Sequence, residues 1–229
     1  MPPRVKTTFE DWARSDAYHN RALLGQDTIL EQTLKESESA GLDNIAVSAA
    51  QGKYLNLQVR SLKAARVLEV GTLGGYSAIC MARALPNGGK LTTLEIEPLH
   101  VEVAKKNIER AGLVDKVEII LGPALDTLPK LGPDHSFDFA FIDADKTNNA
   151  AYFKQAQRLV KPGGVVIVDN VVRNGRVADE TLKDDVSVEG VRELLTHVGQ
   201  DPTVEATTIA TVGDKGYDGF MYAIVNTDK

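Results

Sequence analysis

Residues 66–77 read RVLEVGTLGGYS, and this stretch decides the fold. It begins with a strand-like run, Arg66–Val70, and continues with glycines at positions 71, 74 and 75. Glycine lets the backbone turn tightly and approach a ligand, and a helix that begins at such a turn presents unpaired N–H groups to that ligand. The stretch therefore predicts a strand, a ligand-binding turn and a helix, as in one unit of an α/β sheet.

The same alternation continues along the chain. Four further strands are predicted at Lys90–Ile96, Val117–Leu121, Phe137–Ile142 and Gly164–Val168. Helices are predicted between the strands, at Tyr76–Leu85, Leu99–Ala111, Ala124–Leu131 and Asn148–Val160. Strands joined by helices pair in parallel, and these strands are apolar on both faces. We therefore expect a mostly parallel sheet with helices on both sides.

The two ends of the chain depart from this alternation. Helix formers fill residues 9–40, and Ser48 is a suitable N-cap for a second helical stretch that ends near Leu62. These features predict an N-terminal helical extension, residues 1–63, that packs on the same domain as residues 64–229.

The C-terminal part predicts an antiparallel hairpin. After a helix at about Ser187–Gly199, strand-like runs at Thr203–Val212 and Phe220–Val225 flank turn residues that include Gly213 and Gly216. The whole sheet is therefore expected to have seven strands, of which the last two form an appended antiparallel pair.

The composition narrows the function classes. Among 229 residues, 32 are acidic and 26 are basic, so the formal net charge is −6 and no large basic face for nucleic acid is expected. A single cysteine, Cys80, excludes an internal disulfide and a cysteine-based zinc site. No apolar run approaches the ~20 residues that span a bilayer, and the N-terminal residues lack the apolar core of a secretory signal. We expect a cytoplasmic protein without a membrane partner.

Two acids beside the glycine turn indicate the cofactor. Glu95 ends the second strand, 24 residues after Gly71, where an acid suits the hydroxyls of a ribose. The dinucleotide fingerprint is not met, because position 73 is Leu and the glycines are spaced differently. Glu69 would repel a diphosphate but can accept hydrogen bonds from an ammonium group. These features predict S-adenosylmethionine, which carries an α-amino group and no phosphate.

Acids also follow the fourth and fifth strands. Asp143, Asp145 and Lys146 follow one strand, and Asp169 and Asn170 follow the other. Oxygen donors without sulfur or imidazole suit a hard divalent cation such as Mg²⁺, Ca²⁺ or Mn²⁺. In the alternative interpretation, Asp169 and Asn170 only cap a loop, and Asp145 pairs with Lys146.

Several of these motifs together resemble the cation-dependent O-methyltransferases, which include caffeoyl-CoA and catechol O-methyltransferases. The resemblance rests on Leu68–Ser77, Gly122–Ala124, Phe141–Lys146 and Asp169–Gly175, and it extends from about Ile45 to Gly175. It implies a Rossmann-like class I methyltransferase fold, a homodimer, and methyl transfer from S-adenosylmethionine to a small catechol-like aromatic.

The resemblance also implies a role for each matching residue. The cofactor site would include Val47, Glu69, Gly71, Thr72, Ser77, Glu95, Ala124, Asp143 and Asp145. The metal ligands would be Asp143, Asp169 and Asn170. Lys146 would be the general base, acting beside Asp143, and Asn174 would contact the substrate.

The chain departs from the plant caffeoyl-CoA enzymes at Arg173 and at Asp184–Ser187, where their tyrosine-rich run is missing. They carry an aromatic residue where this chain has Arg173, which weakens the case for a CoA thioester and makes Arg173 a candidate substrate contact.

The alternatives to a catechol methyltransferase are an RNA-modifying methyltransferase, a cofactor-binding protein without turnover, and a nicotinamide oxidoreductase.

The chain has four histidines: His19, His100, His135 and His197. They are not expected to be ligands, because none of them shares a strand end with the acids. Cys80 is expected to be a small buried apolar residue.

Overall fold

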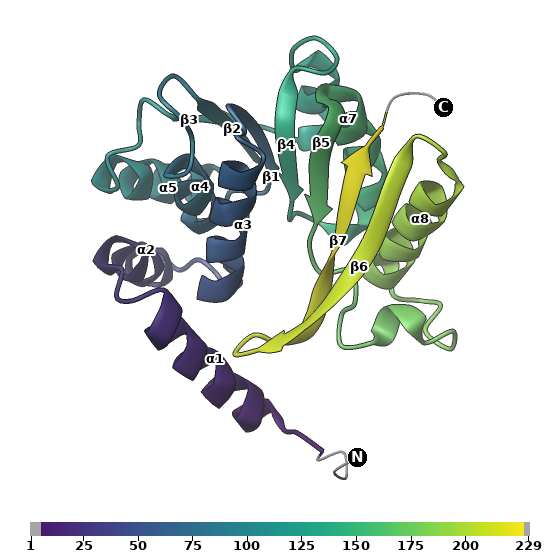
Figure 1. Cartoon of the computed structure of the whole chain (residues 1–229), viewed down its shortest axis with the longest axis horizontal. Helices are drawn as coiled ribbons and strands as arrows, with labels where there is room; N and C mark the ends of the chain where they lie inside the picture. The colour runs from purple at the N-terminus through teal and green to yellow at the C-terminus, as the bar shows by residue number, and fades with distance from the viewer. Residues whose placement is uncertain (1–5, 227–229) are drawn as a thin grey trace.

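The computed structural model describes residues 6–226, so the outermost residues of both predicted segments, 1–5 and 227–229, lie outside it. These residues surround one seven-stranded sheet (Figure 1). The strands are β1 (Arg66–Val70), β2 (Lys90–Glu95), β3 (Val117–Leu121), β4 (Phe137–Ile142), β5 (Val160–Val168), β6 (Val204–Gly213) and β7 (Gly216–Val225).

The strand order is β3-β2-β1-β4-β5-β7-β6. β1 to β5 pair in parallel, and β7 is antiparallel to both of its neighbours, β5 and β6. The predicted fold class, a mostly parallel sheet with an appended antiparallel pair, is confirmed.

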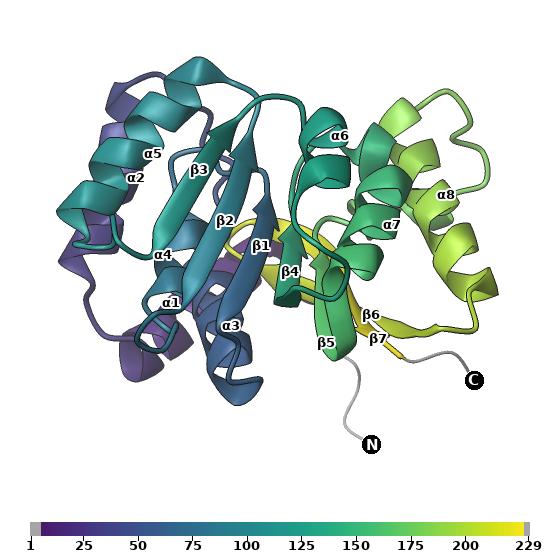
Figure 2. The same ribbon diagram turned by 90° about the horizontal axis from the view of Figure 1, so that it is seen from above.

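Helices cover both faces of this sheet (Figure 2). They are α1 (Phe9–Leu23), α2 (Thr28–Ser39), α3 (Ala49–Ser61), α4 (Tyr76–Ala82), α5 (Pro98–Arg110), α6 (Ala124–Thr127), α7 (Asn149–Leu159) and α8 (Val186–Gln200), with short 3₁₀ turns η1 (Leu128–Lys130), η2 (Lys146–Asn148) and η3 (Arg176–Ala178). None of the helices within residues 6–226 is both long and apolar enough to cross a membrane.

Alternate residues of β1 face different cores, as expected for a strand that is covered on both sides. Leu68 and Val70 pack in the core that includes Phe153 of α7 and Leu194 of α8. Val67 packs in the other core, with side chains of α3 and α4. Glu69 is on the same side as Val67, and it is therefore a carboxyl group in an apolar layer.

The predicted N-terminal helical stretch is two helices rather than one. Gly25 adopts a φ of +69°, and Asp27 caps α2 by accepting a hydrogen bond from the N–H of Leu30 at 3.1 Å. Asp27 also forms an ion pair with Arg83. The cap predicted at Ser48 is present, since Ser48 Oγ accepts from the N–H of Gln51 at 3.2 Å.

The C-terminal hairpin is longer and tighter than the sequence pattern indicates. Gly213 pairs with Gly216, so only Asp214 and Lys215 form the turn. The predicted gap between the two strands was wrong, because Gly216 adopts a φ of +98° and lets the ladder continue to its last pair. The tip reaches α1, where the N–H of Asp214 donates to Asp16 Oδ2 at 3.1 Å (Figure 1).

Candidate functional site

The carboxyl ends of β1, β2, β4 and β5 open into a cavity of about 1040 Å³. Its walls are the loops after these strands, the segment 44–48 ahead of α3, and two residues of the hairpin, Lys215 and Asp218. The predicted site residues that line it are Val47, Gly71, Thr72, Ser77, Glu95, Ala124, Asp143, Asp145, Lys146, Asp169, Asn170, Arg173 and Asn174. Glu69 is fully buried behind this wall.

The glycine loop after β1 is packed on both sides. A Cβ atom on Gly71, whose φ is +96°, would lie 2.0 Å from the carbonyl oxygen of Asp143. A Cβ atom on Gly74 would lie 2.1 Å from Ser37 Oγ of α2. The carbonyl of Gly74 also accepts a hydrogen bond from Asn107 Nδ2 of α5 at 2.9 Å. The Asp143 backbone and the positive φ therefore require glycine at position 71, whereas a side chain at position 74 would have to displace the Ser37 hydroxyl.

Glu95 ties this loop to the end of β2. Its Oε2 accepts from the N–H groups of Thr72 at 3.1 Å and Leu73 at 2.8 Å. Its Oε1 accepts from the N–H groups of Ile96 at 2.9 Å and Glu97 at 3.0 Å. A carboxylate offers about four lone-pair sites, so these four N–H donors hold Glu95 in one orientation at the edge of the cavity.

Glu69 lies under the glycine loop with both oxygens hydrogen-bonded. Ser77 Oγ donates to Oε1 and Thr93 Oγ1 donates to Oε2, each at 2.6 Å. Burial nevertheless raises the pKa of Glu69 to about 8, although the two hydroxyl groups lower it. The residue is therefore an acid that is mostly neutral at pH 7 and that gains a charge if a cation is brought close to it.

Lys146 and Asp143 form the polar pair at the end of β4. Lys146 Nζ donates to Asp143 Oδ1 at 2.8 Å, and the lysine side chain is 9% exposed. The alternative pairing of Asp145 with Lys146 does not occur. Asp145 instead accepts from Tyr152 Oη at 2.5 Å and from Asn148 Nδ2 at 2.7 Å.

Asp169 and Asn170 follow β5 beside this pair. Burial and the nearby Asp143 raise the pKa of Asp169 to about 7, and Lys146 opposes this effect. Residues 6–226 contain no cluster of three or more His, Cys, Asp or Glu side chains arranged for a metal ion. The candidate set consists instead of two carboxylates and the amide of Asn170. These are hard oxygen donors without sulfur or imidazole, so the set fits a hard divalent cation.

The loop after Asn170 is strained and then anchored. Positive φ angles occur at Asn170 (56°), Arg173 (53°), Asn174 (56°) and Gly175 (77°). Such angles are unfavourable for Arg173, and less so for asparagine, which tolerates them better than other residues with side chains. Nε of Arg173 is buried and has no hydrogen-bond partner among residues 6–226. Arg173 and Asn174 both line the cavity, so this loop forms part of its wall.

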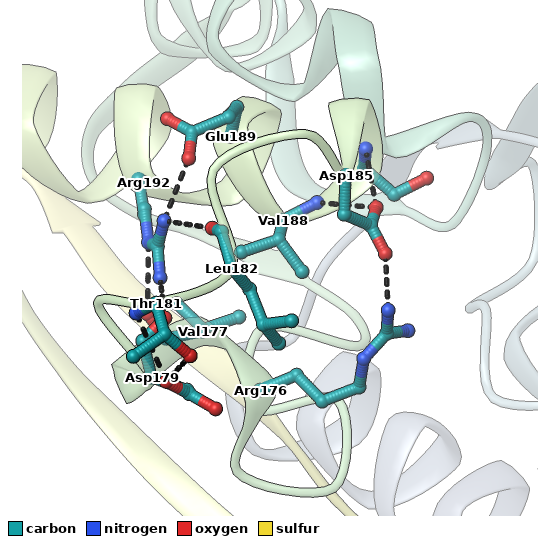
Figure 3. Close-up of polar contacts among 10 residues, drawn as sticks. Arg176, Val177, Asp179, Thr181, Leu182, Asp185, Val188, Glu189 and Arg192 are labelled. Carbon is teal, nitrogen blue, oxygen red and sulfur yellow. Dashed lines mark hydrogen bonds and ion pairs between the residues drawn. The ribbon is translucent and has the colours of Figure 1, made fainter.

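Arg192 of α8 holds the continuation of this loop (Figure 3). Its guanidinium donates to three backbone carbonyls, those of Val177 (3.0 Å), Leu182 (2.7 Å) and Asp179 (2.5 Å). Arg176, which lines the cavity, pairs with Asp185, and Asp185 also caps α8. The segment is therefore fixed to the body of the domain.

Sequence reasoning missed residues that reach the site from elsewhere. His100 Nδ1 lies 3.4 Å from Glu95 Oε1 and lines the cavity, so the prediction that no histidine shares a strand end with the acids was wrong. The reason is that α5 begins immediately after β2 and its first turn folds back over Glu95. Thr93 and Asp218 were also missed. Cys80 is buried, as predicted, and burial raises its pKa to about 12.

Comparison with known proteins places this geometry in a family. The family model described as O-methyltransferase matches residues 20–218, so the likeness extends past the Gly175 limit seen in the sequence. Catechol O-methyltransferase of Mycobacterium tuberculosis is 49% identical over 212 residues, 92% of this chain and 94% of that protein. Caffeoyl-CoA O-methyltransferase 1 of Eucalyptus globulus is 36% identical over 178 residues, 74% of this chain and 72% of that protein.

A solved structure shows the same fold with a nucleoside product in place. The O-methyltransferase of Bacillus cereus in complex with SAH superposes with a TM-score of 0.93 at 45% identity, covering 96% of this chain and 100% of that one. The predicted resemblance is confirmed. The chain belongs to the O-methyltransferase family, and it is an S-adenosylmethionine-dependent O-methyltransferase.

Proposed function

We propose that this enzyme transfers a methyl group from S-adenosylmethionine to one hydroxyl of a small catechol-like aromatic, and that the reaction depends on a divalent cation. The observation that carries the proposal is the set of Asp143, Asp169, Asn170 and Lys146 at the edge of the cavity, next to the glycine loop. The relative of Mycobacterium tuberculosis that is named a catechol O-methyltransferase supports the acceptor class.

The cofactor residues divide into three groups by position. Glu69, Gly71, Thr72 and Ser77 surround the loop after β1 and would bind the methionine end, with Val47 across the cavity. Glu95 would contact the ribose hydroxyls, because it lines the cavity at the end of β2. Ala124, the first residue of α6, would lie beside the adenine, and Asp145 and Asp143 would complete the site. S-adenosylmethionine supplies the methyl group on a sulfonium centre.

Asp143, Asp169 and Asn170 would hold the divalent cation, for which Mg²⁺ is the first choice and Ca²⁺ and Mn²⁺ are alternatives. A bound cation would lower the pKa of a hydroxyl that contacts it. Positive charge at this place would also offset the repulsion between Asp143 and Asp169. After burial, this repulsion is the next cause of the raised pKa of Asp169.

Lys146 is the base in this proposal. Its Nζ reaches the strand end through a bond of 2.8 Å to Asp143 Oδ1, so Asp143 positions it beside the acceptor hydroxyl. In its neutral amine form, Lys146 Nζ takes the hydroxyl proton and becomes an ammonium group, which leaves the acceptor oxygen free to attack the methyl group. The glycine loop and the loop after β5 then hold the two reactants in line, so positioning supplies much of the rate.

Asn174 and Arg173 are the proposed acceptor contacts. Both line the cavity, on the loop after β5. The Arg173 guanidinium suits an acidic substituent on the aromatic ring, such as the carboxylate of caffeic acid.

The substitution Asp169→Ala tests the proposal. We expect it to abolish methyl transfer to catechols in the presence of Mg²⁺ while the affinity for S-adenosylmethionine changes by less than about threefold, because Asp169 is not among the residues of the cofactor loop. Asp184→Ala removes an exposed acid outside the cavity and is the matched control. Full turnover by the Asp169 variant would refute the metal assignment.

We also propose that the enzyme is a homodimer. Apolar side chains of α1 are exposed, among them Phe9 (49%), Tyr18 (63%) and Leu23 (77%), and burying them against a second copy would be favourable. Sedimentation at micromolar concentration tests this, and a monomeric mass would contradict it.

A further inference from the structure

The C-terminal hairpin is bound to the loop after β5 by every backbone N–H from 171 to 174. The N–H of Val171 donates to the carbonyl of Gly219, and the N–H of Asn174 donates to the carbonyl of Tyr217, each at 2.9 Å. The two N–H groups between them, of Val172 and Arg173, both donate to one carboxylate oxygen, as the next paragraph describes. The loop therefore takes its shape from residues 217–219.

Asp218 is the centre of this contact. Its Oδ1 accepts from the N–H groups of Val172 at 3.1 Å and Arg173 at 2.8 Å, and from the N–H of the next residue, Gly219, at 2.9 Å. Its Oδ2 accepts from the side-chain amide of Asn170, with 3.2 Å between Nδ2 and Oδ2. A carboxylate that accepts several N–H bonds in this way is an anion bound by the backbone.

The bond to Asn170 decides which end of the amide faces the cavity. Because Nδ2 is the atom that donates to Asp218, Oδ1 is turned away from Asp218, and Asn170 lines the cavity together with Asp143 and Asp169. An amide carbonyl oxygen is a ligand for a hard cation, whereas an amide NH₂ group is not. The orientation of one amide thus determines whether a third oxygen donor is available.

The conformation of the loop after β5 depends on contacts from outside the loop. Asn170, Arg173 and Asn174 all have positive φ angles; asparagine tolerates them, but Arg173 keeps such an angle only when other interactions hold it there. Gly219 shows how closely the hairpin approaches, since a Cβ atom at this position would lie 2.7 Å from Val172 Cγ2.

We propose that Asp218 is a positioning residue for the metal site: its carboxylate folds the loop after β5 and orients the Asn170 amide so that Oδ1 is presented to the cation. The inference rests on the proposed function, because it assigns a purpose to a residue near the proposed metal ligands. Partners of metal ligands of this kind typically contribute a factor of 10–100 to metal affinity.

Four variants of the full chain test the inference, with Mn²⁺ as the probe. Free Mn²⁺ is measured by electron paramagnetic resonance, which reports the affinity without reference to activity. In Asp218→Asn, an NH₂ group faces the NH₂ group of Asn170, so we expect the amide to turn and the affinity to fall about 10- to 100-fold. Asp214→Asn makes the same charge change in the turn of the same hairpin and is expected to bind as the wild type does.

For Asn170→Asp, the proposal and a simple count of charges predict opposite changes in metal affinity. Asn170→Asp adds a carboxylate, so counting charges predicts tighter binding of a divalent cation. We expect weaker binding, because two carboxylates then meet across the 3.2 Å contact with Asp218. In the double variant N170D/D218N, the amide at 218 donates to the carboxylate at 170, and affinity should return to within about threefold of the wild type.

Affinity for S-adenosylmethionine and the melting temperature show whether each variant is folded. If Asp218→Asn does not fold, Asn170→Asp and the double variant decide the question. Wild-type affinity in Asp218→Asn, tighter binding in Asn170→Asp, or no recovery in the double variant would each overturn the role of Asp218 while the proposed function stands. A wild-type protein that binds no Mn²⁺ would instead contradict the metal dependence itself, and the inference with it.

Discussion

Replacing Glu69 by Gln keeps the shape of a fully buried side chain but removes its ability to ionise. In the unliganded protein the pKa of Glu69 is raised from 4.5 to about 8, so about nine in ten of these carboxyls are protonated at pH 7. A carboxyl pKa that rises on folding makes the folded state less stable as the pH increases from 4.5 to about 8, by ~1.4 kcal/mol for each pH unit. The variant E69Q should therefore match the wild type below pH 5 and be more stable than it, by a few kcal/mol, at pH 8.

Cofactor binding should rank the two proteins the other way, with tighter binding by the wild type than by E69Q. If the ionised carboxylate of Glu69 stabilises the ammonium group of S-adenosylmethionine, binding at pH 7 must first remove a proton, at a cost of ~1.4 kcal/mol. Wild-type affinity should then rise nearly tenfold for each pH unit between pH 6 and 7.5. E69Q should lack this dependence and should bind at least about tenfold more weakly at pH 8, because a hydrogen bond to a charged group contributes ~1.5–3 kcal/mol.

Isothermal titration calorimetry measures both effects. Titrations in two buffers with different ionisation enthalpies give the number of protons that are released, which we expect to be close to one at pH 7 for the wild type and lower by about one for E69Q. The variant is also the control for ionisation of the cofactor itself, since both proteins bind the same ligand. Equal affinity of the two proteins, or a wild-type affinity that does not change with pH, would refute the assignment of Glu69 to the ammonium group.

Three further substitutions test the walls of the cavity. Gly71→Ala should destabilise the protein by ~2–4 kcal/mol in chemical denaturation, because its Cβ would meet the carbonyl of Asp143 at 2.0 Å; Gly25→Ala, with a φ of +69° but no atom within 4 Å, should lose only ~1 kcal/mol. Arg192→Ala removes the donor to three backbone carbonyls. It should lower the melting temperature by ~4–10 °C and raise the KM for the acceptor. An unchanged KM would show that the segment that Arg192 holds does not shape the cavity. Arg173→Ala should reduce kcat/KM for caffeic acid by about tenfold and for unsubstituted catechol by less than about threefold, and equal losses for the two acceptors would contradict a contact with the carboxylate.

The sheet and most of the cavity lining could be predicted from the sequence because they follow from local patterns. Strand-like runs that alternate with helices give a parallel sheet, and the carboxyl ends of parallel strands meet at one edge. Glu95, Asp143 and Asp169 lie far apart in the chain but each ends or follows a strand, so the fold rule alone brings them to one cavity.

What could not be predicted depends on contacts between distant segments. Asp218 lies 48 residues after Asn170, on a strand that pairs antiparallel, and nothing in its own neighbourhood marks it as a partner of that amide. The contact of Asp27 with Arg83, 56 residues away, likewise joins α2 to the end of α4 in a way that the local sequence does not indicate. The burial of Glu69 beside Thr93 likewise depends on the pairing of β1 with β2.

The central claim is that methyl transfer to a catechol depends on a divalent cation held by Asp143, Asp169 and Asn170. The most direct measurement is transfer of a labelled methyl group from S-adenosylmethionine to caffeic acid, a catechol flavonoid and caffeoyl-CoA, each with Mg²⁺ and with EDTA. The account predicts turnover on at least one of these acceptors, its loss in EDTA, and its recovery when Mg²⁺ is added in excess. Turnover that is unaffected by EDTA would contradict the account.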